Sequence, residues 1–91
     1  MLLLMDILGR HLLPDFWQRH PDSESGLRGA AAIIAAAAWQ SDGDIARHLG
    51  TAAAYAGEGW VTITDPDGHF RLVLRIDYPR QLVQILSVAE A

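Results

Sequence analysis

The segment that most constrains the fold is residues 70–78, where apolar and polar residues alternate. An alternation with a period of two is typical of a β-strand that buries one face. Turn-forming residues flank the segment at 65–68 and at 79–81. The expected inward set is Phe70, Leu72, Leu74, Ile76 and Tyr78, and the outward set is Arg71, Val73, Arg75 and Asp77. We therefore expect the central strand of an antiparallel meander, with one face on the core and one face open.

Two further strands complete the predicted meander. Residues 60–64 are rich in β-branched and aromatic side chains, which favour strands. Residues 82–88 are apolar at nearly every position, which is typical of a strand inside a sheet. Residues 1–8 are short and apolar and could form an edge strand.

The first half of the chain has helical patterns. Alanine, the best helix former, fills most of residues 29–38, and we expect a helix over 22–39. Residues 12–20 predict a shorter helix, and 44–49 predict one or two helical turns. The expected stripe of the long helix is Leu27, Ala31, Ile34 and Ala38, and Ser23 or Asp22 can cap its start.

These patterns predict one α+β domain over residues 1–91. It has an N-terminal strand, two helices and a three-stranded antiparallel meander, with the helices packed on one face of the sheet. The chain has no cysteine, which excludes disulfides and thiolate chemistry. Its longest apolar stretch, residues 29–39, has about half the length of a membrane span, so we expect no membrane contact and a cytoplasmic location. The net charge of −4 argues against binding nucleic acid by charge alone.

The open face of the central strand holds the first candidate site. Arg71 and Arg75 would lie roughly 13 Å apart there and could hold successive phosphates. The pattern alone favours an ordinary solvated face with cross-strand ion pairs, in which Asp77 could neutralise one arginine. His69 could serve as a general acid or base, or could be a plain surface histidine, and the pattern leaves both open.

The remaining candidates have simpler interpretations. We expect His20 to have a structural role at a helix end. No two histidines have metal-ligand spacing, and the turn at 65–68 lacks the later ligands of a calcium loop, so neither a metal nor a cofactor is expected. The apolar stripes assign most aromatic residues to the core rather than to base stacking.

Three segments, in this order, resemble the HigB-type toxins of the RelE-like group of bacterial type II toxin–antitoxin systems. Phe16-Trp17-Gln18-Arg19-His20-Pro21-Asp22 resembles the family segment F-W-x-(R/K)-H-P-(D/E). Ala38-Trp39-Gln40-Ser41 followed by Asp44-Ile45 resembles A-x-W-x-(S/T)-x-x-(D/E)-(I/V). Phe70-Arg71-Leu72-Val73 followed by Arg75-Ile76-Asp77-Tyr78 resembles (Y/F)-R-L-(V/I)-x-(R/K)-(I/V)-x-(Y/F).

The resemblance implies a RelE-like fold and an endoribonuclease that cuts mRNA, typically on the ribosome. It also implies a cognate antitoxin partner of helix-turn-helix type. In that mechanism a ribose 2′-hydroxyl attacks the adjacent phosphate, which needs acid–base groups and a cation. The candidate catalytic residues are then Arg71, Arg75 and His69. Arg19 and Arg80 join Arg71 and Arg75 as candidate RNA-binding residues.

The chain also departs from the family pattern. Leu86 stands where the family has a basic residue, and the family's G-T-H-x-E-Y-D tail has no counterpart, so we expect a shortened C-terminal tail. Residues 1–4 would be an N-terminal extension, because Met5 matches the usual start. These departures leave a second interpretation, a catalytically weak or inactive toxin-like module that only binds an antitoxin. A small α+β domain unrelated to toxins is the third.

Overall fold

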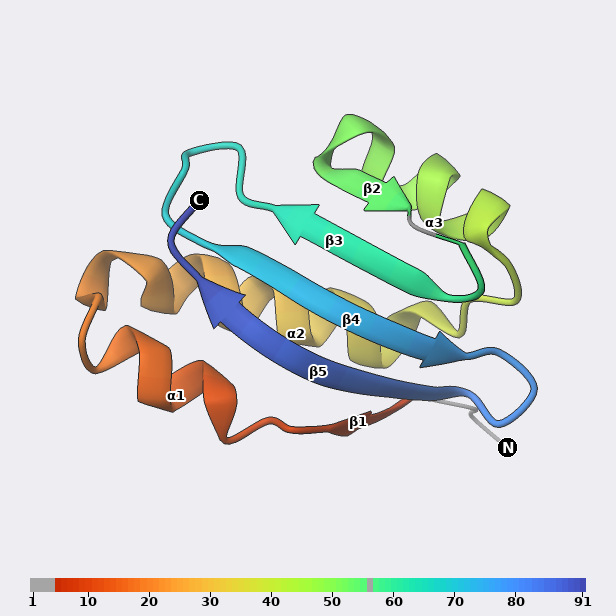
Figure 1. Cartoon of the computed structure of the whole chain (residues 1–91), viewed down its shortest axis with the longest axis horizontal. Helices are drawn as coiled ribbons and strands as arrows, with labels where there is room; N and C mark the ends of the chain where they lie inside the picture. Colours follow the sequence, from red (N-terminus) through yellow and green to blue (C-terminus); the bar gives the residue numbers. More distant parts are fainter. Residues whose placement is uncertain (1–4, 56) are drawn as a thin grey trace.

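The computed structural model describes residues 5–55 and 57–91, which form a five-stranded mixed sheet with helices behind it (Figure 1). The strands, in sheet order, are β1 (Asp6–Leu8), β5 (Leu82–Ala89), β4 (Arg71–Asp77), β3 (Trp60–Thr64) and β2 (Ala53–Tyr55). The helices are α1 (Leu12–Trp17), α2 (Glu24–Ala37) and α3 (Asp42–Leu49), with short 3-10 turns at Pro21–Ser23 and Gly50–Ala52. The α+β class expected from the sequence is confirmed.

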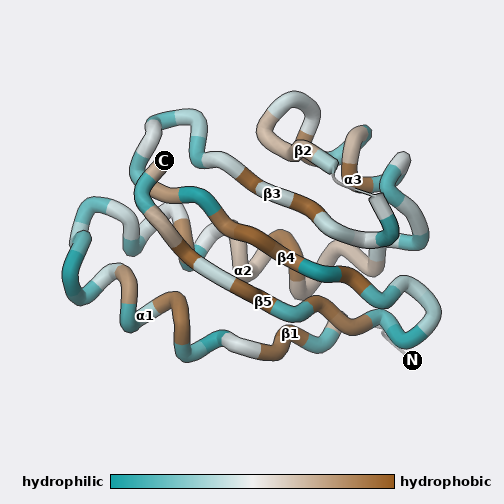
Figure 2. Tube along the Cα trace, viewed as in Figure 1, coloured by the Kyte–Doolittle hydropathy of each residue, from teal (hydrophilic) through white to brown (hydrophobic). Residues whose placement is uncertain are grey.

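Strand β4 has the predicted alternation. Leu72, Leu74 and Ile76 are buried, whereas Arg71 and Arg75 are exposed on the other face. The same alternation appears as brown and teal bands along the strand in Figure 2. Strand β5 lies between β1 and β4, so the prediction that it is inside the sheet is also confirmed.

The prediction of one N-terminal strand and a three-stranded meander is incomplete. Strand β2 adds a fifth strand, because the Ala-Ala-Tyr segment pairs antiparallel with β3 although it has little intrinsic strand preference. Of the expected edge strand at 1–8, the described residues form a strand at Asp6–Leu8, which lies at the edge of the sheet and pairs parallel to β5. Residues 1–4, the expected extension, lie outside the described residues.

The helical turns expected at 44–49 form α3, which begins two residues earlier, at Asp42, whereas the bounds of the other two helices differ from the prediction. The helix expected over 12–20 ends at Trp17, because Pro21 disfavours helical backbone at His20, whose φ is −134°. The expected long helix begins only at Glu24. Ser23 precedes it, but the Ser23 hydroxyl donates to the carbonyl oxygen of His20 at 2.7 Å and does not cap the helix.

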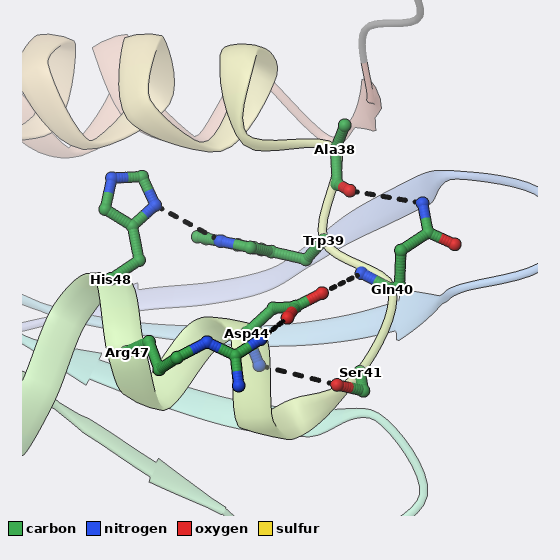
Figure 3. Close-up of polar contacts among 7 residues, drawn as sticks. All are labelled: Ala38, Trp39, Gln40, Ser41, Asp44, Arg47 and His48. Atoms are coloured by element: carbon green, nitrogen blue, oxygen red, sulfur yellow. Dashed lines mark hydrogen bonds and ion pairs between the residues drawn. The ribbon is translucent and has the colours of Figure 1, made fainter.

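The end of α2 is set by the burial of Trp39, which the sequence pattern had placed inside the helix. Ala38 is left-handed (φ 49°), and this turns the Trp39 indole into the core, where Nε1 donates to His48 Nδ1 at 3.2 Å (Figure 3). Ser41 then caps α3 by accepting from the backbone N–H of Asp44. The second family-like segment therefore builds the α2–α3 corner.

The core lies between the helices and one face of the sheet. Helix α2 contributes Leu27 and Ile34, which are fully buried, while Ala31 of the predicted stripe is half-buried and Ala38 lies beyond the helix. Helix α2 runs behind β4 and β5, so Figure 1 looks onto the uncovered face. Among the described residues no helix is both long and apolar enough to cross a membrane.

Gly59 sets how closely β3 approaches β4, and this gives a test of the fold. Its φ is +84°, and an added Cβ would fall inside contact distance of the Ile76 carbonyl oxygen. Gly57 has nearly the same φ, +86°, but open space around it. We expect Gly59→Ala to lower the free energy of unfolding by about 2 kcal/mol more than Gly57→Ala in urea titrations. Equal effects of the two substitutions would contradict the close approach.

Candidate nucleic-acid interface

The uncovered face of the sheet is built from side chains that alternate with the buried ones on three neighbouring strands. A β-bulge between Val73 and Leu74 of β4 sets two β5 residues, Ile85 and Ser87, opposite this pair and leaves Leu86 between them unpaired. The outward side chains are Trp60, Thr62 and Thr64 of β3, Arg71, Val73, Arg75 and Asp77 of β4, and Leu82, Gln84, Ser87 and Ala89 of β5.

Arg71 and Arg75 have no acidic cross-strand neighbour. Arg71 pairs with Thr64 and Ala89, and Arg75 pairs with Trp60 and Gln84. No carboxylate of residues 5–55 and 57–91 forms an ion pair with either guanidinium. The cross-strand ion pairs that the sequence pattern favoured are therefore absent from this part of the chain. The two guanidiniums are available to an external anion.

Asp77 shares this face, but it does not neutralise Arg71 or Arg75. Its carboxylate accepts from the backbone N–H of Arg80 at 3.2 Å and lies 3.6 Å from Arg80 Nε. Arg80 follows the far end of β4, roughly 20 Å along the strand from Arg71. Arg80, a predicted RNA-binding residue, is thus at the opposite end of the face from Arg19, another of them, and from His69, a predicted catalytic residue.

Arg75 contacts an aromatic ring instead of a carboxylate. Its guanidinium carbon lies over the Trp60 ring, 5.1 Å from the centroid. Trp60 is 36% exposed. The assignment of most aromatic residues to the core left Trp60 out, and no site was predicted for it. Its place in the strand, out of phase with the buried Val61 and Ile63, already points it outward.

A cavity of about 500 Å³ lies at the Arg71 end of the face. It brings Arg19 and His20, which are adjacent in sequence, together with the distant His69, and Glu90 also lines it. Arg71 does not line the cavity, but Glu90 follows Ala89, the β5 partner of Arg71, so the cavity lies close to the Arg71 end of the sheet. The structure therefore groups Arg19, His69 and Arg71 at one end of the sheet, with Arg75 four residues further along β4.

Both histidines of this cavity contact a carboxylate. His69 Nδ1 lies 3.4 Å from Asp65 Oδ2, and the backbone N–H of His69 donates to the same carboxylate at 3.1 Å. His20 Nδ1 lies 3.4 Å from Glu90 Oε1, and its ring stacks on Phe16 with centroids 4.4 Å apart. The stacking agrees with the structural role expected for His20. The carboxylate beside His69 leaves the Nε2 side of that ring for proton transfer.

The β3–β4 turn also groups three possible metal ligands. One ligand atom each from Asp65, Asp67 and His69 lies within 4.8 Å of the others. Three groups could hold a transition-metal ion with open positions, but they fall short of the six to eight oxygens that Ca²⁺ takes. Spacing between histidines could not detect this cluster, because two of its members are aspartates.

The other end of the face borders a groove of about 810 Å³. Three acidic residues line it, Asp42, Glu58 and Asp77, together with Arg75 and Tyr78. The Tyr78 hydroxyl donates to the Asp42 carboxylate and so ties the end of β4 to the start of α3. Burial first, and then the hydrogen bond to Asp42, raise the pKa of Tyr78 well above its ordinary value.

Comparison with known proteins finds no family model that matches the chain and no curated relative. The class that fold and site define is an α+β domain with a cationic, partly aromatic sheet face.

The Tyr78–Asp42 contact predicts a loss of stability in alkali. Tyr78 stays neutral in the folded state beyond the pH at which it ionises in the unfolded chain. The contribution of the Tyr78–Asp42 contact to the free energy of unfolding is therefore complete below about pH 10 and is lost as the pH rises further. We expect the free energy of unfolding to fall less steeply above pH 10 in Tyr78→Phe than in the parent chain. Parallel pH profiles of the two proteins would show that the contact contributes nothing.

Proposed function

We propose that the chain is a HigB-type toxin of the RelE-like group, an endoribonuclease that cleaves mRNA and is neutralised by a cognate antitoxin. The observation that carries the proposal is the pair of guanidiniums, Arg71 and Arg75, on the uncovered side of the sheet. Both are exposed, and no described carboxylate pairs with them. The motif resemblance supplies the reaction class, and the order of elements is compatible with it.

The proposed chemistry uses the Arg71 end of the face. Arg71 would hold the scissile phosphate by a forked contact and stabilise the charge that develops on it. His69, which Asp65 orients through Nδ1, would take the proton of the ribose 2′-hydroxyl at Nε2. The 2′-oxygen then bonds to phosphorus while the bond to the 5′-oxygen breaks. The leaving 5′-oxygen takes its proton from water, because the ring of His20, the other imidazole at this cavity, is stacked on Phe16.

Removal of the two arginines tests the proposal. In a bacterial host without antitoxin, we expect the parent chain to arrest growth and to cut transcripts. Loss of one contact that stabilises the transition state costs about 100-fold or more in rate. Arg71→Ala should therefore abolish arrest, and Arg75→Ala should weaken it. Arg47→Ala is the matched control, because Arg47 is exposed on α3 rather than on the sheet face.

Growth and transcripts that are unaffected by the folded parent chain would overturn the nuclease proposal. The second candidate function, a toxin-like module that binds an antitoxin without cleaving RNA, would then stand. Leu86 favours this second candidate, because an apolar side chain at the β5 bulge occupies the position where the family has a basic one.

The antitoxin would bind along helix α2. Its exposed side carries Ile33, which is 41% exposed and borders an apolar groove of about 280 Å³ between α2, β3 and the Gly50–Ala52 turn. An exposed apolar groove of this kind suits the apolar face of a partner helix. Both toxin interpretations share this surface.

A charge placed in the groove should prevent complex formation. We expect Ile33→Asp to lose co-purification with the protein encoded beside it, because the introduced carboxylate would be buried without a partner. Ser25→Asp is the control, since Ser25 is exposed in the first turn of α2 and does not line the groove. Undiminished capture by Ile33→Asp would place the antitoxin elsewhere.

A further inference from the structure

We propose that the guanidinium of Arg75, supported by the Trp60 indole, is a stacking platform for one unpaired nucleobase of the bound RNA. The inference rests on the proposed function and refines it. It assigns the backbone of the RNA to the Arg71 end of the face and a base to the Arg75 end.

The geometry of the pair suits a flat ligand. Trp60 and Arg75 are direct partners across β3 and β4, and the guanidinium carbon lies over the ring at 5.1 Å. Both groups are planar, so the free side of the guanidinium offers a surface on which a base can stack. The resulting arrangement has three layers: indole, guanidinium and base.

Trp60 is the one aromatic side chain on the uncovered face among residues 5–55 and 57–91. Trp39 is buried, and Trp17 lies under Arg28 in α2, with the Arg28 guanidinium carbon 4.6 Å from its ring centroid. Phe16 and Phe70 are buried, and Tyr78 is tied to Asp42 on α3. Tyr55 is 40% exposed, but it pairs with the buried Val61 and therefore points to the other face of the sheet. Among the described aromatic residues, Trp60 is therefore the one whose ring could meet a ligand on the uncovered face.

The turn before Trp60 fixes the backbone from which the ring projects. Gly59 approaches β4 so closely that its carbonyl oxygen accepts from the Ile76 N–H at 2.8 Å. The backbone N–H of Trp60 donates to the carbonyl oxygen of Gly57 at 3.0 Å. These contacts fix the register that sets Trp60 opposite Arg75, so the backbone that carries the pair is ordered before a base binds.

The charges around the pair favour a base over a phosphate. Asp42 and Glu58 line the groove beside Arg75, and neither forms an ion pair within residues 5–55 and 57–91, so their carboxylates would repel a phosphate. Asp77 also lines the groove, but it is paired with Arg80. A nucleobase carries no charge and avoids this cost. Near Arg71 the carboxylates of Asp65 and Glu90 each lie against a histidine instead. The two arginines therefore meet different parts of the same RNA strand.

The test compares a short single-stranded RNA with the same strand carrying one abasic position, scanned along its length, in fluorescence binding titrations. Stacking on one base contributes about 5- to 100-fold in affinity. We expect one abasic position to weaken binding to the parent chain by at least the lower value. Arg75→Lys, which keeps the charge but loses the plane, and Trp60→Leu should each remove this dependence on the base. Trp60→Phe should retain most of it.

The outcomes separate this inference from the proposed function. Binding that depends on Arg71 but not on any base, with Arg75→Lys equal to the parent chain, would overturn the stacking platform and leave RNA binding intact. Failure of the folded parent chain to bind any of the strands would overturn both. Circular dichroism of each variant checks its fold, and Trp60→Phe together with Arg75→Lys gives the answer if Trp60→Leu fails to fold.

Discussion

Burial of one side of strand β4 is the constraint on which the fold and the candidate site depend. Leu72, Leu74 and Ile76 are each at most 4% exposed, and a slip of one residue would bring all three to the surface. The same alternation places the side chains of Arg71 and Arg75 on the uncovered face. The residues that stabilise the domain thus also determine where its cations point.

The bulge in β5 keeps the buried side chains of β4 and β5 on the same face along the whole length of the pair. Leu86 is the extra residue, and beyond it Val88 lies opposite the buried Leu72 while Ser87 points outward. Without the bulge the two strands would be out of phase at this end. The apolar run at 82–88 predicted an internal strand, but it could not reveal the bulge, because nearly every side chain in it suits either face.

Where local pattern and tertiary packing agree, the sequence was a good guide. The turns at 65–68 and 79–81, the alternation of β4 and the break at Pro21 all follow from local chemistry. Strand β2 and the parallel pairing of β1 depend instead on neighbours distant in sequence. Trp39 shows the same limit. Alanine propensity would continue the helix, but burial of the large indole ends it.

The candidate site was predictable to a similar degree. Exposure of Arg71 and Arg75 follows from the alternation alone, whereas the identity of their neighbours requires the register. That register replaces the expected carboxylate partners with Thr64, Ala89, Trp60 and Gln84. It also brings His20 and Glu90 to the cavity that His69 lines, which no spacing in the sequence indicates.

The central claim is that RNA lies along the uncovered face of β4. The most direct measurement is a titration of the isotopically labelled chain with a short single-stranded RNA, followed by NMR. We expect shifts of the guanidinium signals of Arg71 and Arg75 and of the Trp60 indole N–H, with little change in the helices behind the sheet. Shifts confined to α2, or no shifts with a well-folded spectrum, would contradict the claim.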